Sequence, residues 1–206
     1  MKNVIFDLDG TLWDSRSSIV NAWNQVFVRR GYELINADKL TPLIGLSQKD
    51  IIRSLYKLSD KEINDLQREL SSEELLYLRK YGGVLYQDVE KCLNTLKKDY
   101  NLFIVSNCQD GYIEVFLEYY QLQNLFQDFE SAGRTKMEKS ENIRQVINRN
   151  NITDTVFYVG DTEYDLISAR KNNIPFIFVD YGFGNTQDYD FVIKEFKELP
   201  VLLDSL

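Results

Sequence analysis

The chain has 206 residues, of which 44% are hydrophobic, so it can bury the core of one folded domain, or of one domain with a modest insertion, and does not read as a disordered protein. Its net charge of −8 argues against a general nucleic-acid binder, which would present a basic surface. Histidine is absent, which excludes histidine-dependent triads and most catalytic zinc sites.

The first apolar run, residues 3–6, predicts a strand buried inside a sheet. The sequence shows no convincing strand from about residue 15 to about residue 83. Instead, apolar side chains recur at helical spacing at Ile19, Ala22, Trp23, Val26 and Phe27. Further helices are predicted at 50–58, 62–70 and 72–81. We therefore expect residues 15–83 to form a helical cap, inserted into an α/β core made of residues 1–14 and 84–206.

Beyond the insertion, helical patterns alternate with apolar runs. The helical patterns span 88–99, 111–122, 140–149 and 163–172, and the apolar runs span 102–106, 155–160 and 175–180, with weaker runs at 128–132 and 190–194 and a final helix after them. Most of these runs do not alternate with polar residues, which is typical of strands buried on both faces of a parallel sheet. The alternation predicts right-handed crossovers and a three-layer α/β/α sandwich with a Rossmann-like parallel sheet.

Polar side chains stand where the predicted strands end. They are Asp7 and Asp9 after the first strand, Ser106 and Asn107 at the end of the 102–106 strand, and Asp161 and Asp165 after the 155–160 strand. Lys139 begins the helix after the weaker 128–132 strand. Ligands of open parallel sheets bind beyond the carboxyl ends of the strands, so these groups are expected to meet. Each alone could be a turn, a helix cap or a surface charge, but their convergence favours a functional site.

Asp7 and Asp9 lie one residue apart, directly after a buried strand. Two carboxylates held this close repel, and each raises the free-energy cost of ionising the other. A metal ion is the usual partner that offsets such a cost, and Mg²⁺ prefers oxygen ligands. The pair therefore predicts a metal site at the end of the first strand.

These motifs and their order resemble the haloacid-dehalogenase-like (HAD) superfamily, and more narrowly its phosphatase branch with a small helical cap, which includes phosphoglycolate phosphatase-like enzymes. DLDGT at 7–11 resembles the first signature of the family, VSN at 105–107 the second and GDTEYD at 160–165 the acidic fourth. KSENI at 139–143 resembles the third, a lysine at a helix start, which we place at Lys139. Lys136 is the competing choice.

The resemblance implies an Mg²⁺-dependent phosphatase that acts on a small phosphorylated metabolite through an aspartyl-phosphate intermediate. Asp7 would be the nucleophile, and Asp9 would be the general acid and then the general base. Crowding between the two carboxylates should help to keep Asp9 protonated for its first role. Ser106 and Lys139 would hold the phosphoryl oxygens.

The same resemblance implies the ligands of the metal and the contacts of the substrate. Mg²⁺ would be held by Asp7, by the backbone carbonyl of Asp9 and by Asp161, with Asp165 orienting a metal-bound water or the lysine. Backbone N–H groups after Asp7, through Gly10 and Thr11, would add donors to the phosphate. Asn107 and, from the cap, Arg16 are further candidates for substrate binding.

Two other functions stay open at this point. A phosphomutase of the same superfamily would carry a cap histidine where this chain has Ile19, which counts against that activity. A non-catalytic phospho-receiver-like signalling domain also combines acidic residues, a Ser or Thr and a lysine, but it would be shorter and would lack the helical insertion.

The presence of Asp9 argues against a dehalogenase, because a departing halide needs no proton. The sequence does not choose among phosphoglycolate, a sugar phosphate, a nucleotide monophosphate and pyrophosphate.

The cysteines and the first residues bear on the compartment. The spacing of Cys92 and Cys108 suits neither a zinc site nor a disulfide framework, which favours a reducing environment. MKNVIFDLDG has one lysine and a very short apolar run, so it reads as neither a signal peptide nor a membrane span. We expect a cytoplasmic protein without a nucleic-acid or membrane partner, and the sequence leaves its oligomeric state open.

Overall fold

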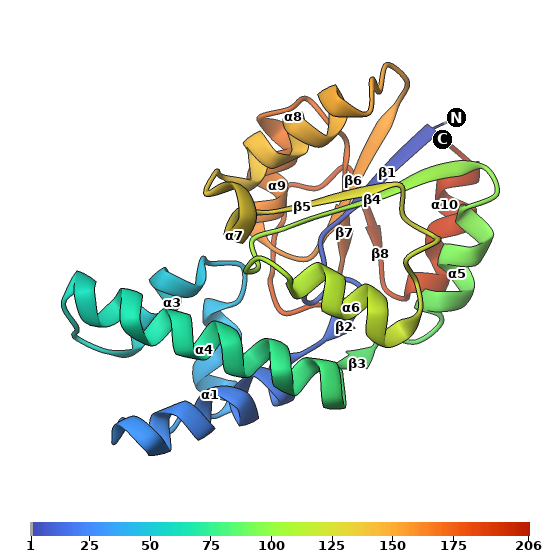
Figure 1. The fold of residues 1–206 in the computed structure, drawn as a ribbon. Helices are drawn as coiled ribbons and strands as arrows, with labels where there is room; N and C mark the ends of the chain where they lie inside the picture. The colour runs from blue at the N-terminus through green and yellow to red at the C-terminus, as the bar shows by residue number, and fades with distance from the viewer. Residues whose placement is uncertain (1) are drawn as a thin grey trace.

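A parallel sheet forms the centre of the protein in the computed structural model, which describes residues 2–206 (Figure 1). Its strands are β1 (Lys2–Phe6), β4 (Tyr100–Ser106), β5 (Asp128–Ser131), β6 (Val156–Gly160), β7 (Phe176–Val179) and β8 (Phe191–Ile193). Their order is β5-β4-β1-β6-β7-β8, and every neighbouring pair is parallel. Both weakly predicted strands are present, and the predicted α/β fold is confirmed.

Helices cover both faces of this sheet, which explains why the strands do not alternate with polar residues. Ile5 packs into a cluster with side chains of α8 (Lys139–Arg149) and α9 (Glu163–Arg170). Its neighbours Val4 and Phe6 point to the opposite face, where α5 (Val89–Leu96), α6 (Tyr112–Tyr120) and α10 (Leu199–Asp204) contribute to the core. Successive strand residues face opposite sides, so both sides of β1 must be apolar.

Residues 15–83 are helical, as predicted. They form α1 (Arg16–Arg30), α2 (Ala37–Leu40), the short 3₁₀ helix η1 (Thr41–Leu43), α3 (Gln48–Leu55) and α4 (Asp60–Tyr81), which we call the cap helices. The prediction of separate helices at 62–70 and 72–81 is wrong, because Ser71 and Ser72 lie inside one continuous helix. Ser59 and Glu62 form a capping box at its start, and neither Gly nor Pro interrupts it. None of the helices within residues 2–206 is long and apolar enough to cross a membrane.

A two-stranded antiparallel ribbon joins the cap helices to the core. It is made of β2 (Trp13–Asp14) and β3 (Val84–Leu85), which are too short to leave a pattern in the sequence. A Cβ at Gly83 would lie 2.8 Å from the Trp13 ring and 2.9 Å from the Asp14 carbonyl oxygen, so this close approach of the two chains requires glycine. The two passages of the chain between core and cap therefore lie side by side (Figure 1).

The cap helices have a core of their own, and α1 packs along α4 in it (Figure 1). The five side chains predicted to share one face of α1 are all buried there. Val26 is fully buried, whereas Val28 on the same helix is 67% exposed.

These two valines give a matched test of the packing. We expect Val26→Ala to lower the free energy of unfolding by about 2 kcal/mol, because it removes two buried methyl groups and leaves a cavity. Val28→Ala makes the same chemical change at the surface and should stay within about 0.5 kcal/mol of the wild type. Urea denaturation followed by circular dichroism measures both, and equal effects would contradict the packing described here.

Candidate active site

The carboxyl ends of β1, β4 and β6 bring three polar side chains together. Asp7 directly follows β1, Ser106 ends β4 and Asp161 directly follows β6. Phe6 is in register with Ile104 on one side and with Val159 on the other, so the three strands end at the same level. All three polar residues are buried, each at most 5% exposed.

Lys139 connects this group of acids. It is the first residue of α8 and is 4% exposed, and its Nζ donates hydrogen bonds to Asp7 Oδ1 at 2.7 Å and to Asp165 Oδ1 at 2.6 Å. Burial lowers the pKa of Lys139, but the charges of Asp165 and Asp7 outweigh this effect and hold its pKa well above the usual value. Lys139 is therefore a positive charge fixed beside Asp7.

The competing lysine is turned away from the acids. Lys136 ends the short helix α7 (Ala132–Thr135) with a φ of +63°, and its ammonium group donates to the carbonyl of Gly133. It is exposed. Of the two lysines left open by the sequence, only Lys139 contacts Asp7 or Asp165.

The acids around Lys139 could hold a metal ion. Asp7, Asp161 and Asp165 each offer one carboxylate oxygen, and these oxygens lie within 4.8 Å of one another. The backbone N–H groups of Phe183 and Gly184 donate to Asp161 Oδ2, while the buried Oδ1 has no hydrogen-bond partner. A buried oxygen without a partner costs free energy unless a donor or a cation meets it. An all-oxygen set of this kind fits a hard divalent cation such as Mg²⁺.

Burial is the largest influence on the pKa values of Asp161 and Asp7. It raises the pKa of Asp161 to about 7, and the nearby charge of Asp165 adds to the effect. Burial also raises the pKa of Asp7, which Lys139 opposes. Asp165 is held on both oxygens: Lys139 and the Tyr158 hydroxyl donate to Oδ1, and the Thr162 amide and hydroxyl donate to Oδ2. Asp165 is thus placed to orient Lys139.

Asp9 lies beside the acids but its carboxylate is not part of their cluster. Trp13 Nε1, Ser15 Oγ and the Tyr112 hydroxyl all donate to its Oδ1, at 2.9, 2.5 and 2.8 Å. Burial raises the pKa of Asp9, and these three bonds oppose the shift. The sequence argument attributed a protonated Asp9 to crowding by Asp7. In the structure, burial is the largest cause of the raised pKa of Asp9.

In the turn after Asp7, the backbone amides of Gly10 and Thr11 point elsewhere than predicted. The N–H groups of Gly10 and Thr11, predicted to face a phosphate, donate instead to the carbonyls of Trp13 at 2.9 Å and Leu8 at 3.3 Å. A Cβ on Gly10, whose φ is +86°, would lie 2.2 Å from Asp161 Oδ2, so only glycine fits there. Among the hydrogen bonds of residues 2–206, none uses the amides of Leu8 and Asp9. The sequence argument named Gly10 and Thr11 but not Leu8 and Asp9. The amides of Leu8 and Asp9 are the donors beside Asp7 that could bind a ligand.

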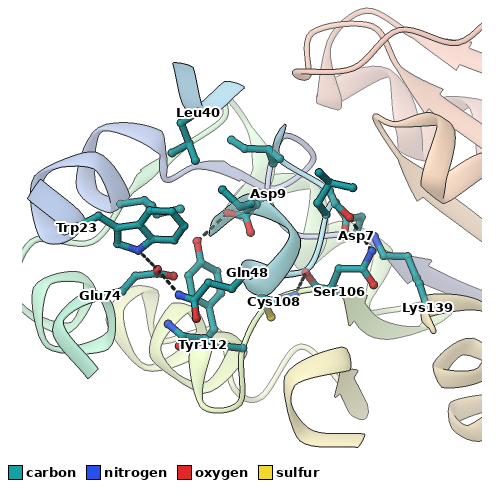
Figure 2. A pocket seen from close by; sticks show the side chains of 17 residues that line it. Asp7, Asp9, Trp23, Leu40, Gln48, Glu74, Ser106, Cys108, Tyr112 and Lys139 are labelled. Atoms are coloured by element: carbon teal, nitrogen blue, oxygen red, sulfur yellow. Dashed lines mark hydrogen bonds and ion pairs between the residues drawn. The ribbon is translucent and has the colours of Figure 1, made fainter. Parts of the chain in front are cut away.

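A pocket separates the core from the cap helices, with a volume of about 600 Å³ when the space at its open mouth is counted (Figure 2). The core lines it with Asp7, Asp9, Ser106, Asn107, Cys108, Gln109, Tyr112 and Lys139. The cap helices and their connections line it with Ile19, Trp23, Leu40, Ile44, Gly45, Leu46, Gln48, Ile51 and Glu74. A mainly apolar lining with a few polar and charged groups is typical of sites for small ligands.

The two remaining candidates for substrate binding lie in different surroundings. Asn107 lines the pocket, and its Nδ2 donates to the carbonyl of Gly45 at 2.7 Å, which links the core to the cap. Arg16 does not line the pocket. Its guanidinium donates to Asp14 and to Thr41 Oγ1 and lies over the Phe183 ring, 4.3 Å from the centroid. The structure therefore does not bring Arg16 to the site, because Asp14 engages it.

The cap side of the pocket holds a buried carboxyl group that the sequence gave no reason to single out. Glu74 of α4 is 4% exposed, and Trp23 Nε1 and Gln48 Nε2 donate to its Oε2. Burial raises its pKa to about 8, against the effect of these bonds. In the sequence Glu74 is one acid among many on a charged helix, so only the packing of α1 and α3 against α4 sets it apart.

Comparisons with known proteins agree with this geometry. Residues 4–179 match the family described as haloacid dehalogenase-like hydrolase. A phosphoglycolate phosphatase of Aliivibrio fischeri is 26% identical, with 98% of this chain and 96% of that protein covered, and a 5′-nucleotidase of Pseudomonas aeruginosa is 21% identical, with 90% and 86% covered. A haloacid dehalogenase-like hydrolase of Bacteroides fragilis has a similar crystal structure, with a TM-score of 0.85, 26% identity and coverage of 95% and 98%. The chain belongs to the haloacid dehalogenase-like hydrolases.

Proposed function

We propose that the protein is an Mg²⁺-dependent phosphatase that hydrolyses a small phosphorylated metabolite through an aspartyl-phosphate intermediate. One observation carries the proposal: Asp7 lies at the end of the central strand, on the pocket wall, with a buried ammonium group bonded to it and two free backbone amides after it. The names of the relatives, which include phosphoglycolate phosphatase and 5′-nucleotidase, support hydrolysis of phosphate monoesters.

In this proposal Asp7 attacks the phosphorus atom and displaces the alcohol. Lys139, the Ser106 hydroxyl and the amides of Leu8 and Asp9 bind the phosphoryl oxygens and offset the negative charge that develops on them. Asp165 acts through Lys139, whose ammonium group it keeps in place. Water then attacks the phosphorus of the aspartyl phosphate and releases inorganic phosphate.

Asp9 handles the protons in both steps. Its three hydrogen bonds all reach Oδ1, which leaves Oδ2 to carry a proton, and burial favours the protonated form. It gives this proton to the departing alcohol and later takes one from the attacking water. Ser15 and Tyr112 are positioning residues in this scheme, because they fix the direction in which the carboxyl group points.

Asp7, Asp161 and the backbone carbonyl of Asp9 would hold the Mg²⁺ ion, and the unpartnered Asp161 Oδ1 supports this assignment. When bound, the ion would supply positive charge that favours ionised Asp7 and offsets the charge of the phosphoryl group. Asp165, with both oxygens already bonded, would remain outside the direct contacts.

We further propose that residues 15–83 act as one cap domain over a core made of residues 1–14 and 84–206. The ribbon of β2 and β3 is the joint between the two parts, and Asn107 meets Gly45 across the gap. A pocket closed by such a cap encloses a small metabolite and excludes water during the reaction. The phosphomutase alternative gains no support, because Ile19, which lines the pocket, cannot transfer a proton.

The metal site can be tested without an activity assay. Mg²⁺ should raise the melting temperature of the wild-type protein by a few degrees, because a ligand that binds only the folded state stabilises it. The nearly isosteric Asp161→Asn variant should lose this shift, while Asp60→Asn, at an exposed carboxylate, should keep it. Differential scanning fluorimetry with and without EDTA measures all three, and an unchanged shift in Asp161→Asn would refute the assignment.

The choice between the two lysines is also open to a direct test. Lys139→Ala should lower kcat/KM for p-nitrophenyl phosphate by about 100-fold or more, because it removes a buried charge aimed at the reacting group. Lys136→Ala should match the wild type within experimental error. The opposite ranking would mean that Lys136 moves into the site during catalysis. Circular dichroism of both variants checks that they are folded.

Asp9→Asn separates the two chemical steps. The p-nitrophenolate ion leaves without a proton, so this variant should still be phosphorylated by the aryl ester and should release about one equivalent of nitrophenolate in a burst, followed by slow turnover. With an alkyl phosphate, which needs the acid, the burst should be absent. Asp7→Asn should give neither burst nor turnover while remaining folded. Rapid-quench kinetics decides, and full turnover by Asp7→Asn would mean that the nucleophile lies elsewhere.

A further inference from the structure

The pocket has two chemically different ends. Figure 2 shows Asp7, Ser106 and Lys139 at one end and Trp23, Gln48 and Glu74 at the other, with Asp9 between them. A monoester whose phosphoryl group lies at Asp7 would direct its alcohol part past Asp9 toward Glu74. The surroundings of Glu74 therefore decide which alcohols the site can accept, an inference that rests on the proposed phosphatase function.

Glu74 is fixed in direction by a network of side chains. Trp23 Nε1 and Gln48 Nε2 donate to Oε2, the latter at 3.2 Å. Ser71 Oγ donates to Gln48 Oε1 at 2.6 Å, which sets the amide so that its NH₂ group faces Glu74. These residues come from α1, α3 and α4. The carboxyl group of Glu74 is thus held in a fixed orientation in the pocket wall.

The cap end of the pocket offers no positive charge. Besides Lys139, whose charge is matched by Asp7 and Asp165, the part of the pocket wall within residues 2–206 contains no lysine or arginine. Five arginines of the cap helices are ion-paired outside the pocket: Arg16 with Asp14, Arg29 with Glu73, Arg30 with Glu69, Arg53 with Asp50 and Arg68 with Asp65. The other cap residues of the wall are mostly apolar.

A second anionic group on the substrate would be costly here. A carboxylate brought to the cap end would lose its water and would meet apolar side chains and Glu74 instead of a counter-charge. A hydroxyl or ammonium group, in contrast, could donate a hydrogen bond to Glu74. Lys49 and Lys136 line only a neighbouring groove toward the surface, which they share with Gln48 and Asn107.

We propose that Glu74 and its apolar surroundings select phosphate monoesters whose alcohol ends in an uncharged or positively charged hydrogen-bond donor. Esters that carry a second anionic group besides the phosphate are rejected. The site would thereby disfavour phosphoglycolate, although relatives of this chain are named for that substrate. Glu74 is a specificity-determining residue in this proposal and takes no part in the chemical steps.

Three esters of similar size test the idea, since they differ mainly in the group at the far end: phosphoglycolate, 2-hydroxyethyl phosphate and 2-aminoethyl phosphate. We expect kcat/KM of the wild-type enzyme to be at least about tenfold lower for phosphoglycolate than for either of the others. p-Nitrophenyl phosphate is assayed in parallel. Lack of turnover with all four would refute the proposed function, whereas turnover of the aryl ester with phosphoglycolate as the best of the three would refute this inference alone.

Matched variants assign the preference to Glu74. Glu74→Gln keeps the shape and one acceptor but cannot carry a negative charge, so at pH 9, above the pKa of about 8 of Glu74, it should narrow the ratio between 2-aminoethyl phosphate and phosphoglycolate by about threefold or more. Glu73→Gln makes the same change at the neighbouring residue, which binds Arg29 at the surface, and should leave the ratio unchanged. Equal ratios in all three proteins would overturn the role of Glu74. Efficient phosphoglycolate hydrolysis that falls in Lys49→Gln would overturn it too, by placing the second anion in the neighbouring groove.

Discussion

The ammonium group of Lys139, buried between Asp7 and Asp165, is the interaction on which the rest of the site depends. Removing three charges from water costs several kcal/mol per ion, and only close pairing with good geometry recovers that cost. The three residues belong to the ends of β1, α8 and α9, so the pairing forms only when the sheet and these helices are fully docked. Asp161 beside this pairing has a buried oxygen, Oδ1, without a hydrogen-bond partner, and a hydrogen-bond donor or a cation would stabilise it.

Much of the core could be predicted from the sequence because its signals are local. Apolar runs ending in polar residues predicted the strands, and the parallel order of the sheet then required those ends to meet, so the α/β fold and the family assignment are both confirmed. The sequence could not tell which of Lys136 and Lys139 lies beside Asp7, because that depends on how α8 packs against β1 and α9. The helices predicted at 62–70 and 72–81 are one helix, because the buried positions Ile63, Leu66, Leu70 and Leu78 continue in phase through residue 71.

The parts of the site that the sequence could not supply depend on contacts between distant residues. Tyr112 reaches Asp9 across 103 positions, and Trp23 reaches Glu74 across 51. No local pattern distinguishes Tyr112, Trp23 or Glu74 from ordinary members of their helices. Arg16, predicted to bind the substrate, lies away from the pocket for the opposite reason: its guanidinium is bonded to a local partner, Asp14. The roles of Gly10 and Thr11 changed in the same way, because their amides close the turn that they were expected to leave open.

The ribbon of β2 and β3 has a consequence for how such proteins can diversify. Because Asp14 pairs with Val84, the two ends of the 69-residue-long excursion between them stay one strand spacing apart, about 5 Å, whatever lies in between. Trp13 fixes this junction to the core through its edge-on contacts with Tyr112, Phe116 and Tyr120. The sheet therefore meets the same two closely spaced chain ends whatever the inserted segment contains, so a segment of different length or shape could replace it without a rearrangement of the strands.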